Sequence, residues 1–286
     1  LRIGAAYKLA SIGDEVLAIE YLEQALYSHR ETVRRAATYG LIAVGGKATE
    51  AFLKAIHSPV KWVRKAGVYG LGDTAALNEE VLDAVVFSLY NDPSVYVRAV
   101  AAGTLGCLAR RATGTGVGQF LIPQCLEALI QSLQREENRL SMDLSQKRSI
   151  KFVRPTDECD VCEGNGVDMG LERFKPVRSA VRENTLWSMV IICSQGAPIA
   201  GDALDTTIHS LKEVLRTDEN VICVGFAMDA LSRLANVKTT LPLLPSIEKL
   251  QTELLAILAD SPIQCWEALV RAGLDTKYLS SFSESG

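Results

Sequence analysis

The sequence has no long hydrophobic run and few histidines. Its longest strongly apolar stretch, Leu186–Cys193, is far too short to cross a bilayer, and no signal peptide opens the chain. The three histidines, His29, His57 and His209, lie far apart, and no His-Glu dipeptide occurs. We therefore expect no transmembrane segment and assign no catalytic residue.

Positive charge is not in excess either. The chain has 30 Lys and Arg against 34 Asp and Glu, which gives a formal net charge of −4. General nucleic-acid-binding proteins usually carry a basic excess, so nucleic acid is not an expected partner. Seven cysteines lie mostly singly within apolar helical patterns, which is typical of reduced, buried thiols in a soluble intracellular protein.

A repeated helical motif is the strongest feature that the sequence does contain. Arg2, Arg34, Arg64 and Arg98 are separated by 32, 30 and 34 residues. A small residue follows each arginine after three positions and a leucine after seven. These residues are Ala5, Ala37, Gly67 and Ala101, and Leu9, Leu41, Leu71 and Leu105. Self-similarity at this period predicts a solenoid, in which each unit buries its apolar face against its neighbours.

Each of the last three arginine helices follows another amphipathic helix. These first helices are predicted over Asp14–Ser28, Lys47–His57 and Asn78–Tyr90. Asn91 or Asp92 is expected to cap the next helix, with Pro93 in its first turn. Helix–turn–helix units therefore repeat along the first part of the chain.

The regular spacing breaks after Leu108. A loop over 112–118 precedes another first helix, Phe120–Leu133, and residues 134–175 are polar and irregular. The array then resumes at Arg178, 80 residues after Arg98, which fits one repeat that carries a long insertion. Further helix pairs are predicted over Gly201–Thr217 with Asn220–Ala235, and over Pro245–Ala259 with Pro262–Ala272.

Together these patterns predict one all-α domain over residues 1–286, a right-handed α-α superhelix of about six helix pairs. The polar insertion occupies residues 136–175 of the middle repeat, and residues 280–286 form a mobile tail. Because the chain starts within a helical pattern, we expect that an N-terminal part is missing.

The segment from Val97 to Gly106, with Val97-Arg98, Ala101-Ala102 and Leu105-Gly106, resembles a HEAT repeat. Its short, Gly- and Ala-rich form is similar to the repeats of phycobilisome lyases, and residues 1–110 carry the resemblance clearly. It implies a non-enzymatic scaffold, adaptor or assembly factor that binds protein partners within a larger complex. The alternative that it implies is a bilin lyase or chaperone-like subunit, with a bilin as ligand and a photosynthetic antenna protein as target. The compartment would be the cytoplasm or the plastid stroma.

The same resemblance implies a structural role for the repeated arginines. In HEAT proteins such an arginine commonly pairs with an acidic residue of an inter-helix turn and forms a ladder. Here the ladder would contain Arg34, Arg64 and Arg98, with Asp92 as the acid. An arginine row for an acidic partner is the other interpretation.

Two sets of residues are candidates for partner binding. Tyr7, Tyr39 and Tyr69 share one position of the repeat, so they either pack between repeats or form an aromatic strip that faces a partner. Long insertions are usually functional or disordered, and we favour a docking role for this one. Its basic half contains Arg135, Arg139, Lys147, Arg148, Lys151 and Arg154. The three tryptophans, Trp62, Trp187 and Trp266, are expected in the core or between helices.

The insertion also contains a cysteine pair, Cys159 and Cys162, within the pattern C-x-x-C-x-G-x-G. This pattern resembles one zinc-binding unit of DnaJ-type chaperones. A structural zinc ion requires four ligands, so zinc at Cys159 and Cys162 would need ligands from elsewhere. A redox-active pair and an ordinary loop remain the alternatives, and no cofactor is expected.

Overall fold

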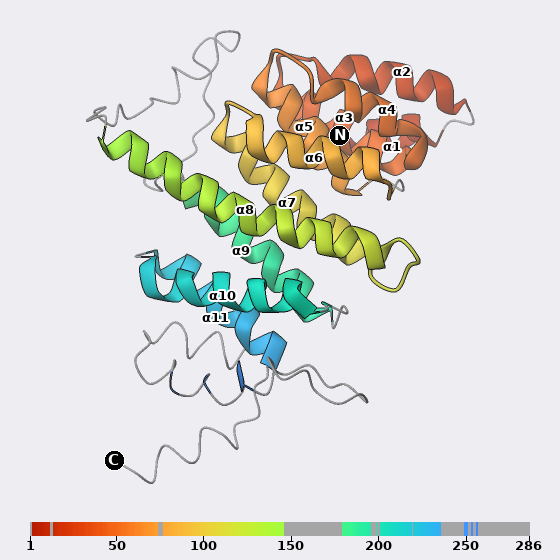
Figure 1. Cartoon of the computed structure of the whole chain (residues 1–286). Coiled ribbons are helices and arrows are strands. Elements are labelled where there is room, and N and C mark those ends of the chain that lie inside the picture. The colour runs from red at the N-terminus through yellow and green to blue at the C-terminus, as the bar shows by residue number, and fades with distance from the viewer. Residues whose placement is uncertain are drawn as a thin grey trace.

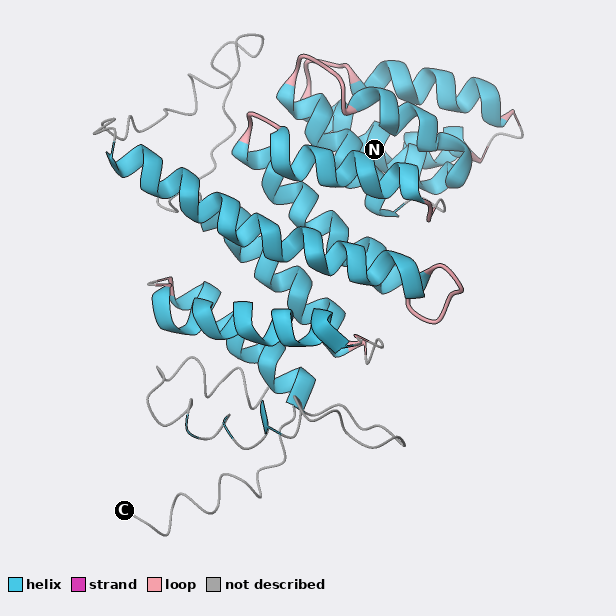
Figure 2. Ribbon diagram, viewed as in Figure 1, coloured by secondary structure: helices cyan, strands magenta, loops and turns pink. Residues whose placement is uncertain are grey.

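The computed structural model describes residues 2–11, 14–73, 77–145, 179–195, 199, 201–218, 220–235, 249, 250, 253 and 256. These residues form helices joined by short turns, without a strand (Figure 2). The helices are α1 (Arg2–Ala10), α2 (Glu15–Leu26), α3 (Glu31–Val44), the 3₁₀ helix η1 (Gly46–Ala48), α4 (Thr49–Ala55), α5 (Lys61–Asp73), α6 (Glu79–Asn91), α7 (Val95–Ala112), α8 (Gly118–Ser145), α9 (Ser179–Ser194), α10 (Gly201–Thr217) and α11 (Val221–Ala235).

The helices are arranged in two layers (Figure 1). Helices α1, α3, α5, α7, α9 and α11 stack on one another in chain order, and we call them the second helices. The first helices, α2, α4, α6, α8 and α10, form the other layer, each packed against the second helix that follows it. This arrangement confirms the predicted fold class, an all-α helical repeat solenoid, for the part of the chain that the structure describes.

Helix ends follow from local chemistry that the sequence shows. Asp14 and Asn78 cap α2 and α6, because their side-chain oxygens accept the N–H groups of Leu17 and Val81. Helix α3 ends at Gly45, whose φ of 83° is accessible to glycine and strained for other residues. These caps place the helices within about two residues of the predicted bounds.

Two local predictions were wrong. Pro93 lies before α7 and outside its first turn, since the helix begins at Val95 after the N-cap residue Ser94. Asp92 still stabilises this helix start, because its carboxylate Oδ1 accepts the N–H of Ser94 at 2.8 Å. Residues 134–145, which were expected to be irregular, continue α8 as far as Ser145.

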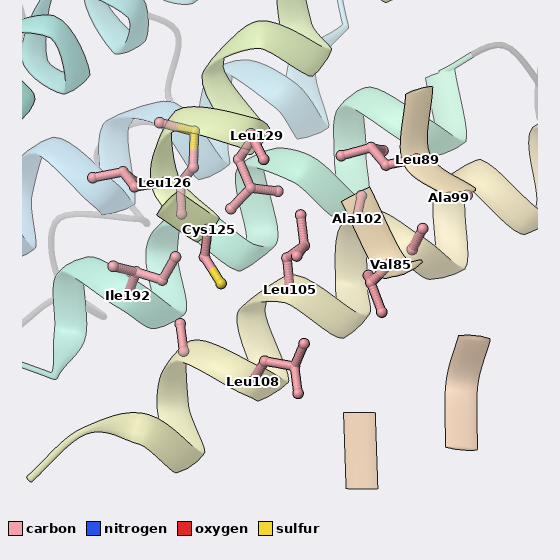
Figure 3. Close-up of a cluster of buried hydrophobic side chains, with 14 of the residues drawn as sticks. Val85, Leu89, Ala99, Ala102, Leu105, Leu108, Cys125, Leu126, Leu129 and Ile192 are labelled. Atoms are coloured by element: carbon pink, nitrogen blue, oxygen red, sulfur yellow. The ribbon is translucent and has the colours of Figure 1, made fainter. Parts of the chain in front are cut away.

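One hydrophobic core runs through both layers. The repeat leucines Leu41, Leu71 and Leu105 are completely buried, and Met189 and Leu231 are buried in the same way in α9 and α11. Figure 3 shows this core around α7, where side chains from α6, α8 and α9 converge on one another. Burying each such side chain contributes about 1.5–3 kcal/mol, so the stacked units stabilise one another.

Helix α9 packs on α7 as α7 packs on α5. The Thr104 hydroxyl donates to the carbonyl oxygen of Val68 at 3.2 Å, and the Ser188 hydroxyl donates to that of Ala102 at 2.8 Å. Thr104 and Ser188 each lie six positions after an arginine, Arg98 and Arg182. The arginine that resumes the repeat is therefore Arg182, one helical turn later than the predicted Arg178, which lies outside the described residues.

The remaining predictions for the fold concern segments outside the described residues. These segments are the rest of the insertion, residues 146–175, and the tail at 280–286. Of the predicted pair after residue 245, only residues 249, 250, 253 and 256 are described, and they are helical.

Candidate protein-binding surface

The repeated arginines form a ladder inside the stack. Arg64 Nε and Nη2 donate to the two carboxylate oxygens of Asp92 at 2.7 and 3.0 Å. Arg64 Nη1 also donates to the carbonyl oxygens of Ser58 and Pro59, which begin the turn before α5. Only 13% of the Arg64 side chain and 6% of the Asp92 side chain are exposed, so this ion pair links two neighbouring units in a largely dry environment.

Two further rungs use acids that the sequence did not reveal. Arg98 donates from Nε to Glu136 Oε1 at 3.0 Å, and Arg182 donates from Nη2 to Asp218 Oδ2 at 2.7 Å. Arg182 Nη1 donates to the Leu133 carbonyl oxygen in α8 at 3.2 Å. Helix α8 thus supplies the acid that pairs with Arg98 and the carbonyl oxygen that Arg182 contacts. For Arg64, both kinds of partner come from inter-helix turns.

Arg34 has only part of this arrangement. Its Nη1 donates to the carbonyl oxygens of Ser28 and His29 at 2.8 and 2.9 Å, and no described carboxylate pairs with it. The position that Asp92 holds in the next unit is occupied here by Ser58, whose Oγ accepts the N–H of Val60. A hydroxyl in this place caps the turn but brings no negative charge to a buried arginine.

Replacing Ser58 by aspartate is therefore expected to add the missing rung. The new carboxylate would accept the Val60 N–H as Asp92 accepts that of Ser94, and would also pair with Arg34, which is 7% exposed. We expect the free energy of unfolding to rise by about 1 kcal/mol, measured by urea denaturation. The same substitution in an Arg34→Met chain should give no such gain, and an equal gain in both would contradict the ladder.

The ladder uses the repeated arginines within the fold, whereas the repeated aromatic side chains reach the surface. Tyr7 is 47% exposed, Tyr69 42% and Trp187 39%, and Tyr39 is half-buried between its neighbours. All four lie five positions after the repeat arginine of their helix, so they follow one another along the stacked second helices. We call Tyr7, Tyr39, Tyr69 and Trp187 the aromatic row.

Trp187 is partly exposed and lies outside the core, against a neighbouring helix, which fits the second of the two expected positions, the core or between helices. On α7 the equivalent position is Gly103, and a Cβ atom built there would lie 4.0 Å from the Trp187 ring. The indole of α9 therefore leans toward the helix that lacks an aromatic side chain. A glycine in the place of a fourth tyrosine leaves room for this larger ring.

Contacts between side chains fix part of the row. The rings of Tyr39 and Tyr69 meet edge to face, with centroids 6.3 Å apart. Burial, followed by a hydrogen bond with the Tyr39 side chain, raises the pKa of Tyr69 to about 12. The Tyr69 phenol is therefore neutral at physiological pH, and its contact with the Tyr39 ring holds it in place.

A second aromatic contact lies two helical turns away, near the N-terminal ends of α5 and α7. The rings of Trp62 and Tyr96 are 5.6 Å apart and tilted by 38°. Lys61 Nζ lies 4.9 Å from the Trp62 ring centroid, and Lys65 Nζ lies 5.6 Å from it. Cation–π attraction to the Trp62 indole orients both ammonium groups.

Of the predicted basic docking residues, only Arg135 has a described side chain, and it does not lie on this face. Arg135 lies in the first-helix layer, where its guanidinium carbon stacks 4.0 Å from the Tyr90 ring centroid. The side chain of Arg139 is not described, although α8 includes its backbone. The other basic residues of the set, Lys147, Arg148, Lys151 and Arg154, lie outside the described residues, as do Cys159, Cys162 and Trp266.

Three of the described cysteines have thiols of low reactivity. Cys125, Cys193 and Cys223 are buried free thiols, and burial raises the pKa of each to about 12. Thiols with so high a pKa are poor nucleophiles and poor metal ligands at neutral pH. Among the described residues, no group of three His, Cys, Asp or Glu side chains is arranged to hold a metal ion.

No described helix combines the length and the apolar character that crossing a membrane requires. No family model matches the chain, and no curated protein shows significant similarity to it.

Proposed function

We propose that this chain is a non-enzymatic scaffold, adaptor or assembly factor that binds a partner protein on the face of its second helices. The observation that carries this proposal is the aromatic row, in which Tyr7, Tyr69 and Trp187 are exposed and Tyr39 is half-buried at the same position of their units. Interfaces between proteins are enriched in tyrosine and tryptophan, which bury a large area and lose little conformational entropy on binding.

The rest of the stack supports the row as a binding surface. The ladder and the interhelical hydrogen bonds hold neighbouring second helices in a fixed relation, so the exposed rings are set in place before a partner arrives. A preorganised surface loses less free energy to ordering when it binds.

Site-specific photocrosslinking tests the proposal. A benzoylphenylalanine residue at Tyr69, in the aromatic row, is compared with one at Phe87, which is 59% exposed on the first-helix α6. In lysate of the source cells, we expect a defined protein, identified by mass spectrometry, to crosslink from position 69 and not from position 87. The identified protein is then produced and its binding to the purified chain is measured.

Equal crosslinking from both positions, or none from position 69, would count against the proposal. Recovery of a tetrapyrrole with the chain, seen as visible absorbance, would support the lyase-like alternative in its place.

A further inference from the structure

The second-helix face carries a specific arrangement of charge and aromatic rings around α5. Trp62, Lys65 and Tyr69 are spaced by three and four residues, so they form one stripe along this helix. At one end of the stripe Trp62 contacts Tyr96 of α7, and at the other end Tyr69 contacts Tyr39 of α3. Lys65 therefore lies between two aromatic pairs.

The ammonium group at the centre of this arrangement, that of Lys65, takes no part in the ladder of ion pairs. Lys65 makes a cation–π contact with Trp62, and no described carboxylate forms an ion pair with it. Arg35, which is exposed, holds the same repeat position on α3 and likewise has no ion-pair partner among the residues described. The ladder arginines, by contrast, are buried and engaged with carboxylates or carbonyls.

The spacing of the two aromatic pairs limits what can bridge them. Trp62 and Tyr69 are seven residues apart, which is about 10.5 Å along the helix at 1.5 Å per residue. The pairs lie on opposite sides of α5, so they are also offset by about one interhelical distance, roughly 8–10 Å. The diagonal between them is thus about 14 Å, and it crosses α5 near Lys65.

An extended peptide matches this diagonal. Four residues of an extended chain span about 14 Å at roughly 3.4 Å per residue, and the side chains at positions i, i+2 and i+4 point to the same face. A segment with apolar side chains at i and i+4 would place one on each aromatic pair. Its residue at i+2 would face the two unneutralised cations.

We propose that this surface binds an extended acidic segment of a partner protein, in which two apolar side chains four residues apart flank a carboxylate. The apolar side chains pack on the Trp62–Tyr96 and Tyr39–Tyr69 pairs, and the carboxylate pairs with Lys65 and Arg35. Asp73 follows one turn beyond Tyr69, outside this footprint, so it does not oppose the carboxylate. The inference rests on the proposed function and names the chemistry of the partner.

A labelled peptide tests this inference directly. The probe is a fluorescein-labelled undecapeptide of Gly and Ser with leucine at positions 4 and 8 and glutamate at position 6. Its binding to the full chain is followed by fluorescence anisotropy at low salt. We expect saturable binding that weakens about tenfold when lysine replaces the peptide glutamate, because a charge-assisted contact becomes a repulsion. Moving the second leucine to position 9 should weaken it similarly, since that side chain then points away.

Matched variants of the protein locate the site. Lys65→Ala should weaken peptide binding about tenfold. Lys54→Ala, in the first-helix α4 beside Glu23, should leave peptide binding unchanged. Circular dichroism checks that both variants remain folded. The inference would be overturned if the affinity stayed the same when the peptide glutamate, the leucine spacing or Lys65 is changed.

Two other outcomes also decide the question. Aromatic rings beside cations are also used to bind single-stranded nucleic acid, so an eleven-nucleotide oligo(dT) is titrated in parallel. Lys65-dependent binding of the oligonucleotide without binding of the peptide would replace the inference by a nucleic-acid site. If the peptide does not bind but a protein crosslinks from position 69, the acidic segment is rejected and the proposed protein-binding function is retained.

Discussion

Replacing Asp92 by alanine is expected to lower the free energy of unfolding by about 3 kcal/mol. The substitution leaves the guanidinium of Arg64 buried without its carboxylate, and it removes the acceptor of the Ser94 N–H at the start of α7. Both losses act at the contact between two units, so the units should also unfold less cooperatively. Urea denaturation followed by circular dichroism measures both effects.

Two control variants separate the two contributions. Asp92→Asn keeps an oxygen acceptor for the Ser94 N–H and loses the charge, so its destabilisation should be smaller than that of alanine. The double variant Arg64→Met with Asp92→Ala should be more stable than Asp92→Ala alone, because no buried charge is left unpaired. Additive effects of the two single substitutions would show that the pair does not act as a unit.

Gly70→Ala should destabilise the chain by about 2 kcal/mol. A Cβ atom at this position would lie 2.2 Å from Cε1 of Phe52, which is completely buried in α4. Because the ring is completely buried and cannot turn out into solvent, we expect α4 and α5 to move apart, at a cost that exceeds the gain of up to about 1 kcal/mol in helix propensity. The midpoint of urea denaturation measures the change.

Gly225→Ala in α11 is the matched control. No described atom lies within 4 Å of a Cβ atom built at Gly225, so only the gain in helix propensity should remain. We expect an increase in stability of about 0.5–1 kcal/mol. Destabilisation by both substitutions, or by neither, would refute the argument that the Phe52 ring determines the effect at Gly70.

Local features of the sequence determined most of the fold. Caps such as Asp14 and Asn78 mark helix starts, and the recurrence of arginine, a small residue and leucine marks the second helices. These signals operate within a few residues of chain, so they can be read without knowing what packs on each helix.

The middle repeat was predicted less accurately. Residues 134–145 are polar in composition, yet α8 continues through them, and Glu136 is buried in an ion pair with Arg98. Arg178 and Arg182 both follow a valine and lie one helical turn apart, so spacing counted across a long insertion does not separate them. Only the packing of Ser188 against Ala102 selects Arg182.

For the candidate surface, the sequence by itself placed Tyr7, Tyr39 and Tyr69 at one repeat position and left open which way they face. The tertiary structure decided that Tyr7 and Tyr69 are exposed, that Trp187 extends the same row, and that Lys65 lies between two aromatic pairs. The physical reason is that the repeat spacing and the tendency to form a helix depend on residues that are neighbours along the chain. Exposure, ring contacts and the ion pairs of the ladder depend on stacked units whose contacting residues are 28 or more positions apart in sequence.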